Sequence, residues 1–417
     1  MSDMKVQMQQ RYPNLITWII FLVTLGVVLL NVASVVFPAL VLRSLGGFED
    51  HLGVNPYEPG IFTYPFLVAN FIVFGLGILH LKKKLPTIIA KPIRFIFNFE
   101  VSRPVAFLII TLLIGIYLSF SVSELYDGKF DADYYERARS WLENFSITDY
   151  SQAGLGYHLG LFLMSSSMKI FGSYKVIPLI ASTSLLLLTY FITSDIAKKR
   201  FAGIVAMVIV LQSGIFLMYD TSVAYPNFWI LFYLLSLYLI CKKWPLSPVS
   251  YISSMLSKAL SAIFFPTTLF FIYRSSISRK KKIRAAISYG AVAVLGLAVW
   301  LAVGSTKILG ISEFDSHKFV GGLTSFYTSF RLDGLVLIFL LPLIVGLFVV
   351  ARKRIMHADS MMFLITIMLL AGPFYVALTG GANVPYRFIP LVVFFAIGVG
   401  LLLSRPKEDP VKSSSEL

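Results

Sequence analysis

An acidic segment carries the clearest chemical potential in the chain. Glu124, Asp127, Asp131 and Asp133 fall within ten residues and directly follow a long apolar run. Carboxylates at this spacing can act as a general base or hold a divalent cation. A structural role is the alternative, because Asp131 suits a helix N-cap and the helix dipole would stabilise Asp133 in the first turn. The spacing lacks the glycine and terminal glutamate of an EF-hand, so a calcium loop of that kind is not expected.

Three further ionisable residues lie within or beside apolar stretches. Lys258 lies inside one, and an ionisable group at membrane depth is costly and usually functional. The stretch is short enough, however, for the Lys258 ammonium to snorkel to an interface. Asp220 borders an apolar run, where it either binds a metal or caps the turn. His158 could join a catalytic site, but a lone histidine among aromatic residues also fits a structural role.

The composition is that of a membrane protein. Of the 417 residues, 57% are hydrophobic and 14% are charged, and the mean hydropathy is +0.80. Soluble domains carry about 25% charged residues, so water is not the main solvent of this chain. The first apolar run, 15–42, is too long for a cleaved signal peptide. The single cysteine, Cys241, excludes an intramolecular disulfide and a multi-cysteine metal site.

The apolar runs predict an all-α polytopic membrane protein with about 10–12 transmembrane helices. A stretch at 249–273 is too long for one helix and too short for two crossings at about 1.5 Å per residue. It also holds Lys258 and Pro266, so we expect a short broken hairpin there. The other predicted spans are 15–42, 60–81, 104–122, 176–194, 202–219, 226–241, 285–304, 334–351, 360–379 and 386–404.

The basic residues predict the orientation of these spans. Most of the 36 lysines and arginines fall in segments that share one side if the N-terminus is cytoplasmic, whereas most acids fall on the other side. This asymmetry follows the positive-inside rule, so we expect a multi-pass cell-membrane protein with both termini cytoplasmic. The net charge of +15 is therefore a topology signal, with some attraction to anionic lipids, and nucleic-acid binding is not needed to explain it.

We divide the chain into a two-span N-terminal extension, 1–103, a transmembrane core, 104–404, and a cytoplasmic tail, 405–417. The core carries two long outer loops, 123–175 and 305–333, and long loops often carry function. In the first loop, 134–145 has aromatic residues at helical spacing and 157–171 is apolar but short. Both pieces are expected to be interfacial helices.

Several segments together resemble the N-terminal core of the GT-C superfamily of membrane glycosyltransferases. That group includes the protein O-mannosyltransferases and the aminoarabinose and other polyprenyl-phosphate-sugar transferases. Its pattern is an outer-loop acid followed by aromatic residues, an interfacial helix, and a helix that closes on a basic turn. The resemblance covers about 104–273, and Pro385-Tyr386-Arg387 is loosely similar to a further signature. The segments that carry it are Asp131-Ala-Asp133-Tyr134, Gly156-Tyr-His158, Lys169-Ile-Phe-Gly172 and the helix 176–194.

The resemblance implies that an outer-loop acid acts as catalytic base or metal ligand, which indicates Asp131 first and Asp133 next. The chain departs from the pattern at Ala132, where many members have a second acid, and it lacks a Pro-Pro before the interfacial helix. Asp220 also lies earlier than the acid often seen in the second outer loop. The choice of base therefore stays open, as does the presence of a divalent cation (Mg²⁺ or Mn²⁺) on Asp131, Asp133 and Asp220.

A polyprenyl- or dolichyl-phosphate sugar donor would need cations near the outer leaflet to hold its phosphate. Arg387 combines an outer-loop position with the resemblance, whereas Arg331 fits an interfacial anchor equally well. Lys258, Asp220 and His158 complete the candidate binding residues.

The resemblance implies an inverting, hexosyltransferase-like enzyme that transfers a sugar from this carrier to a protein, lipid or glycan acceptor at the outer face. A transporter or flippase for a lipid-linked or small substrate is one alternative. The spans, however, show no inverted repeat and few charges at membrane depth. A non-catalytic membrane scaffold, whose acidic loop binds a partner, is another.

Overall fold

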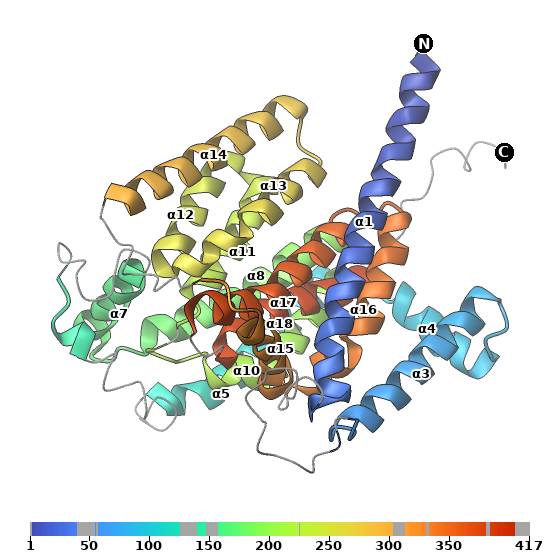
Figure 1. Cartoon of the computed structure of the whole chain (residues 1–417), viewed down its shortest axis with the longest axis horizontal. Helices are drawn as coiled ribbons and strands as arrows, with labels where there is room; N and C mark the ends of the chain where they lie inside the picture. Colours follow the sequence, from blue (N-terminus) through green and yellow to red (C-terminus); the bar gives the residue numbers. More distant parts are fainter. Residues whose placement is uncertain are drawn as a thin grey trace.

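The computed structural model describes residues 2–39, 55, 57–125, 140–146, 157–224, 226–302, 313–330, 333–380 and 384–404. Within these ranges the chain is helical and contains no strand (Figure 1). The elements in chain order are α1 (Ser2–Val36), α3 (Thr63–Leu81), α4 (Thr87–Asn98), α5 (Arg103–Ser121), η1 (Val122–Leu125), α7 (His158–Phe171), α8 (Val176–Ala197), α9 (Arg200–Leu211), α10 (Gly214–Met218), α11 (Phe228–Lys242), η3 (Trp244–Leu246), α12 (Ser247–Ser257), η4 (Ala259–Phe264), α13 (Phe265–Arg274), α14 (Arg279–Ala302), α15 (Ser316–Phe330), α16 (Gly334–Arg352), α17 (Ala358–Thr379), η5 (Pro385–Phe388) and α18 (Ile389–Leu402).

Seven helices in the described ranges are long and apolar enough to cross a membrane. The prediction of an all-α, multi-pass membrane protein is thereby confirmed. Two other predicted spans, 202–219 and 226–241, contain the shorter apolar helices Arg200–Leu211 and Phe228–Lys242, and Gln212 and Ser213 divide the first of these spans into α9 and α10. A third short apolar helix, Ala259–Arg274, lies in the predicted broken hairpin. The seven are Leu15–Val36, Thr63–Leu81, Arg103–Leu125, Val176–Ala197, Gly334–Arg352, Ala358–Thr379 and Pro385–Leu402.

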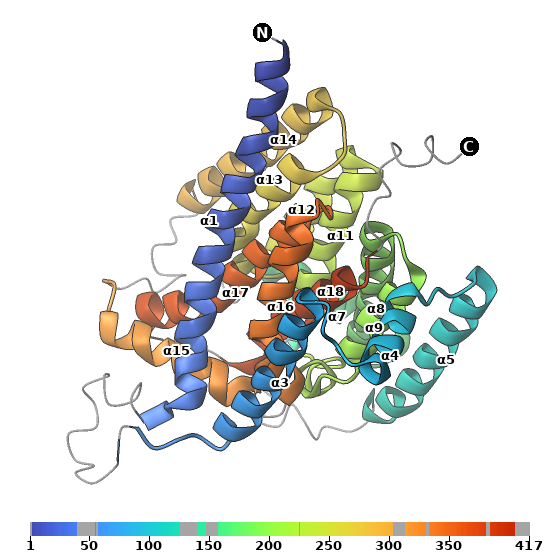
Figure 2. The same ribbon diagram turned by 90° about the vertical axis from the view of Figure 1, so that its right-hand side faces the viewer.

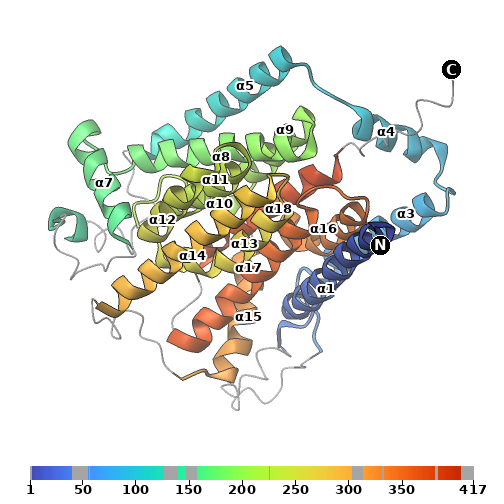
Figure 3. The same ribbon diagram turned by 90° about the horizontal axis from the view of Figure 1, so that it is seen from above.

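Helix α18 forms the centre of the bundle. It packs against α8, α9, α16 and α17, and nearly all of its residues are buried (Figure 3). It approaches α8 and α9 closely at Gly400, where an added Cβ would collide with Thr193 and lie 3.0 Å from the Ala202 carbonyl oxygen. The uniformly apolar sequence of α18 follows from this position, since a helix buried on every side needs no polar face.

The N-terminal helices pack onto the C-terminal half of the chain. Helix α1 contacts α15, α16 and α17, while α3 contacts α16 (Figure 2). Hydrogen bonds between helices support both contacts, as is common where lipid removes the hydrophobic drive for association. The Thr24 and Thr366 hydroxyls lie 2.7 Å apart, and Asn70 Nδ2 donates to the Ile338 carbonyl oxygen at 2.9 Å.

The apolar stretch around Lys258 is broken as expected. Helix α12 ends at Ser257, Lys258 takes an extended conformation, and the chain continues through η4 into α13. Helix α12 packs against α11, whereas α13 packs against α14 and α17. At the far end of α13, Arg274 pairs with the buried carboxylate of Asp359, which also accepts a hydrogen bond from Thr17 at 3.3 Å. This ion pair ties α1, α13 and α17 together.

We expect Gly322→Ala to lower the free energy of unfolding by about 1–3 kcal/mol, the usual cost of overpacking. A Cβ on Gly322 of α15 would collide with the backbone of Pro373 on α17. The matched control is Gly26→Ala in α1, where a Cβ would meet no atom within 4 Å. Thermal unfolding in detergent should separate the two variants. Equal melting temperatures would mean that α15 and α17 are not in this close contact.

Candidate functional site

The short helix α10 positions one part of the site. Its N-terminus is capped from a distance by Asp333, the residue before α16. The Asp333 carboxylate accepts hydrogen bonds from Ser213 Oγ at 2.8 Å, from the Gly214 amide at 2.7 Å and from the Ile215 amide at 3.0 Å. A carboxylate at a helix N-terminus satisfies amides that have no partner within the helix. The turn that follows α10 and carries Asp220 is therefore held to the rest of the bundle.

A polar cluster surrounds Asp220 where α5, η1 and this turn meet. We use the name polar cluster for Ser121, Glu124, Asp220 and Thr221. Ser121 Oγ donates to Asp220 Oδ2 at 2.7 Å, and Thr221 Oγ1 donates to Glu124 Oε2 at 3.1 Å. Ser182 of α8 donates to the Asp220 carbonyl oxygen at 2.7 Å. Asp220 is only 1% exposed, and its Oδ1 atom makes no hydrogen bond in the described structure.

The electrostatics of the polar cluster favour a partly protonated carboxyl. Burial raises the pKa of Asp220 to about 6, and the charge of Glu124 adds to this rise. The hydroxyls of Ser121 and Tyr117 oppose it by stabilising the carboxylate. A carboxyl with such a pKa can gain or lose a proton near neutral pH. Catalytic acids and bases have this property, and so do some groups with a purely structural role.

Two cations meet at a single tyrosine nearby, and we call Lys258 and Arg387 the cation pair. Lys258 Nζ donates to the Tyr386 hydroxyl at 2.5 Å, and Arg387 Nε donates to the same oxygen at 3.3 Å. The Lys258 ammonium also lies over the rings of Tyr386 and Trp229, at 3.9 and 5.9 Å from their centroids. Among the described residues, no carboxylate forms an ion pair with Lys258. Burial removes part of the water that would solvate these two cations. A bound anionic group could supply the hydrogen bonds and negative charge that the water no longer provides.

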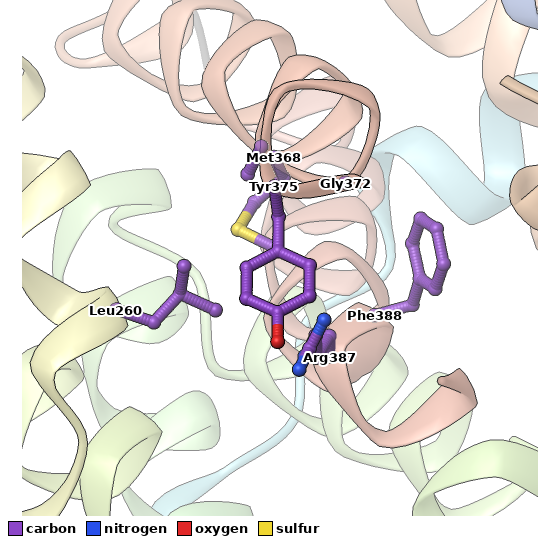
Figure 4. A pocket seen from close by; sticks show the side chains of 7 residues that line it. Leu260, Met368, Gly372, Tyr375, Arg387 and Phe388 are labelled. Atoms are coloured by element: carbon purple, nitrogen blue, oxygen red, sulfur yellow. The ribbon is translucent and has the colours of Figure 1, made fainter. Parts of the chain in front are cut away.

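A small pocket opens beside the cation pair (Figure 4). The Arg387 guanidinium stacks on the Tyr375 ring, with Cζ 3.6 Å from the ring centroid, and both face the pocket. The remaining lining is apolar and comes from η4, α17 and η5. It consists of Leu260, Met368, Ala371, Gly372 and Phe388. The pocket combines a cation with apolar walls, which is the chemistry that an amphiphilic anion needs, but its free space is close to that of a single water molecule, so such a ligand would have to widen it.

The polar cluster and the cation pair belong to one region. Helix α10 packs against η5, and Tyr219 contacts Tyr386 edge-on with the ring centroids 6.0 Å apart. Because Tyr219 directly precedes Asp220 and Tyr386 directly precedes Arg387, this ring contact connects the two groups of side chains. The region also contains the end of the described part of α5 and η1, from which the predicted catalytic loop departs.

The structure brings together Lys258, Asp220 and Arg387, three of the binding residues predicted from the sequence. His158 lies on α7 beside Phe145, with the ring centroids 5.0 Å apart. The neighbouring Tyr157 donates a hydrogen bond to the Ala224 carbonyl oxygen at 2.8 Å, which ties α7 to the segment after Asp220. The candidates Asp131, Asp133 and Arg331 lie outside the described residues.

Sequence reasoning did not single out several residues of this region as functional. Tyr386 stood in the sequence beside Arg387, so an aromatic residue next to a candidate cation was the available signal. Tyr375 and Tyr219 are separated from Arg387 along the chain, and only the tertiary contacts join them. Ser121 was hidden at the end of an apolar span.

The oxygen atoms around Asp220 allow a partial test of whether a divalent cation could bind there. Asp220 offers a buried oxygen without a hydrogen bond, and Glu124 is a second carboxylate close to it. Oxygen ligands of this kind suit Mg²⁺ or Mn²⁺. Within the described ranges, however, no three His, Cys, Asp or Glu side chains form a group that could hold a metal ion. A metal site on Asp131, Asp133 and Asp220 therefore stays a prediction.

Comparison with known proteins yields no match: no family model fits the chain, and neither a curated protein nor a solved structure is significantly similar to it.

Proposed function

We propose that this chain is a GT-C-like membrane glycosyltransferase that uses a polyprenyl- or dolichyl-phosphate sugar as donor. The observation that carries the proposal is the cation pair around Tyr386, beside an amphiphilic pocket and next to a buried carboxyl. In this view the chain crosses the cell membrane about 10–12 times, with its shorter apolar helices contributing some of the crossings. Both termini are cytoplasmic, and the site faces the opposite side.

The cation pair would hold the phosphate of the donor. Lys258 supplies a compact charge, and Arg387 supplies a planar group that can bind two phosphate oxygens at once. Both cations contact the Tyr386 hydroxyl, so they lie close enough together to bind one phosphate. The apolar lining from Leu260 to Phe388 would receive the first part of the carrier's tail. Positive charge at this point also stabilises the phosphate as the sugar leaves it.

Transfer would then be a single displacement at the sugar carbon. A carboxylate takes the proton from the acceptor hydroxyl or amide, the acceptor atom forms the new bond to the sugar, and the bond to the phosphate oxygen breaks. The electron pair of that bond stays on the phosphate, which the cation pair neutralises, and the configuration of the sugar carbon is inverted. We assign the base to Asp131 or Asp133. Asp220 is the next candidate, because its pKa near 6 suits a proton acceptor.

An in vitro transfer assay tests this proposal. The purified chain would be incubated with a panel of polyprenyl-phosphate sugars and with hydroxyl or amide acceptors, and product would be measured for wild type, Asp131→Asn and Asp133→Asn. We expect transfer of one sugar by wild type and loss of about 100-fold or more in one of the two variants, the scale of general-base catalysis. Full activity in both variants would remove these residues as bases. Absence of transfer with every donor would contradict the proposed function.

Tyr386 is proposed as a positioning residue for the cation pair. Tyr386→Phe removes the hydroxyl oxygen that accepts hydrogen bonds from both Lys258 and Arg387. Without this shared acceptor, the two like charges would repel each other and move apart from the position that binds the phosphate. We expect the KM for the donor to rise about tenfold, the effect of losing a charge-assisted hydrogen bond, while kcat changes less.

Tyr289→Phe provides the matched control for this substitution. Tyr289 is also buried, and its hydroxyl lies 2.5 Å from Ser247 Oγ, at the opposite end of α12 from Lys258. Its loss should affect stability without affecting KM. A similar KM in the two variants would show that Tyr386 acts only in packing.

A further inference from the structure

Helix α4 lies between the candidate membrane spans α3 and α5, and it is highly exposed. It follows α3 after a turn that contains Lys82, Lys83 and Lys84, and it precedes α5. None of its residues is buried. The side chain of Ile88 is 86% exposed and that of Phe95 is 64% exposed, values far above those of core residues. An apolar helix left open in this way needs a partner outside the described protein.

The residues of α4 form two opposite faces. Thr87, Lys91, Arg94 and Asn98 are spaced by four, three and four residues, which places them on one side of an α-helix. The other positions carry isoleucine, phenylalanine, alanine and one proline. Helices with a narrow basic face and a wide apolar face typically lie in the plane of the membrane interface.

The position of α4 relative to the bundle is fixed at its C-terminal end. The almost fully buried Lys199, in the turn between α8 and α9, donates from Nζ to the carbonyl oxygens of Ile96 at 3.2 Å and Phe97 at 2.8 Å. A lysine at this point satisfies carbonyls that have no partner within the helix. Just beyond α4, Arg200 Nη1 donates to the Val101 carbonyl oxygen at 3.2 Å. These contacts hold α4 beside the ends of α8 and α9 (Figure 2).

The surrounding charges identify the partner. From residue 82 to residue 103 the chain contains six lysines and arginines and a single acid, Glu100. Glu100 is already engaged, because its Oε1 accepts a hydrogen bond from the Arg200 amide at 3.0 Å. At a membrane surface, anionic phosphate headgroups lie next to the apolar acyl chains. The headgroups match the basic face of α4, and the acyl chains match its apolar face. We propose that α4 lies in the membrane interface and binds anionic phospholipid through Lys91 and Arg94.

A fluorescent label on α4 tests the proposal in the full-length chain. Cysteine would replace Ile88 in a Cys241→Ser background, since Cys241 is the one native thiol and is exposed. The labelled protein would be reconstituted in mixed phosphatidylcholine and phosphatidylglycerol vesicles, with only one of the two lipids brominated at a time. We expect brominated phosphatidylglycerol to quench the label more strongly than brominated phosphatidylcholine. In Lys91→Gln/Arg94→Gln this preference should fall by up to about 30-fold, or roughly fivefold for each basic residue.

The control is Lys280→Gln/Lys281→Gln, which removes the same amount of charge from the exposed first turn of α14. It should leave the lipid preference unchanged. Three results would overturn the proposal. The first is equal quenching by both lipids, and the second is a preference that survives in Lys91→Gln/Arg94→Gln. The third is a label open to iodide in vesicles but shielded in native membranes, which would mean that another protein covers α4.

Discussion

Replacing Lys258 by methionine is expected to lower sugar transfer about 100-fold while leaving the chain at least as stable as wild type. In the proposed mechanism this substitution removes one of the two cations that would stabilise charge on the leaving phosphate, and such a contribution is about 3 kcal/mol in other enzymes. The side chain of methionine has nearly the same length and volume, so the packing against Trp229 and Tyr386 is retained.

The unchanged or increased stability has a separate physical reason. Lys258 is partly buried, and no carboxylate in the described structure pairs with it. A charge of this kind costs free energy in the folded state, and replacing it with an apolar group removes that cost. A more stable but less active Lys258→Met variant would mean that the lysine serves function at the expense of stability.

Two measurements check this prediction, the transfer rate and the melting temperature. Lys258→Arg should recover part of the activity, because it restores the charge with a different shape. Lys318→Met removes an exposed lysine near the start of α15, whose ion pair among the described residues is with Asp315, so it should leave transfer unchanged. If Lys258→Met unfolds the chain, the lysine is structural. If it is stable and fully active, the cation pair does not bind the donor.

The sequence was sufficient to predict the class of fold but not the packing of its helices. The long apolar runs determine the spans, because each must cover the thickness of a membrane. The break at Lys258 was also predictable, since a charge and a nearby proline interrupt an apolar stretch of unsuitable length. Helix α4 was missed, because the search for long apolar runs does not detect a twelve-residue helix with two faces.

The candidate site was predictable as separate residues rather than as an assembly. Lys258 and Arg387 each stood out from their local sequence, yet 128 positions separate Lys258 from the tyrosine that joins it to Arg387. Such a contact depends on how η4 and η5 pack, which no local pattern encodes. The distant cap of α10 by Asp333 is similar, since Ser213, the residue before α10, lies 120 residues earlier in the chain.

The polar cluster and the cation pair each contain a polar group that the described structure satisfies only in part. Other buried polar groups are paired, as in the Thr24–Thr366 contact, while some keep one atom without a hydrogen bond, such as Asp359 Oδ1 beside the Arg274–Asp359 ion pair. At the candidate site, Asp220 Oδ1 makes no hydrogen bond within the described ranges, and no described acid forms an ion pair with Lys258. A carboxyl oxygen and a cation of this kind lie in one region there, and their close placement, rather than incomplete satisfaction alone, is the reason to test the region for ligand binding.

Asp220→Asn is expected to stabilise the chain at pH 7 and above but not at pH 4. Burial raises the pKa of Asp220 to about 6 in the folded state, whereas an aspartate in the unfolded chain titrates near 4. The folded state therefore binds the proton more tightly. Its stability is greatest below pH 4 and is lost as the pH rises from about 4 to about 6. Asparagine stays neutral throughout, so it avoids this loss, which amounts to about 3 kcal/mol for a shift of this size.

Melting temperatures of wild type and Asp220→Asn, measured at a series of pH values, check this prediction. The two curves should meet near pH 4 and separate as the pH rises through 6. Asp315→Asn is the control, because Asp315 is at the surface and backbone N–H groups, first that of Lys318, lower the pKa of its carboxyl. That variant should gain no stability at high pH. Parallel curves for wild type and Asp220→Asn would show that Asp220 does not titrate in this range. A variant that is more stable at pH 7 but transfers sugar more slowly would show why the carboxyl is retained, since an ionised group that weakens the fold can still be required for the reaction.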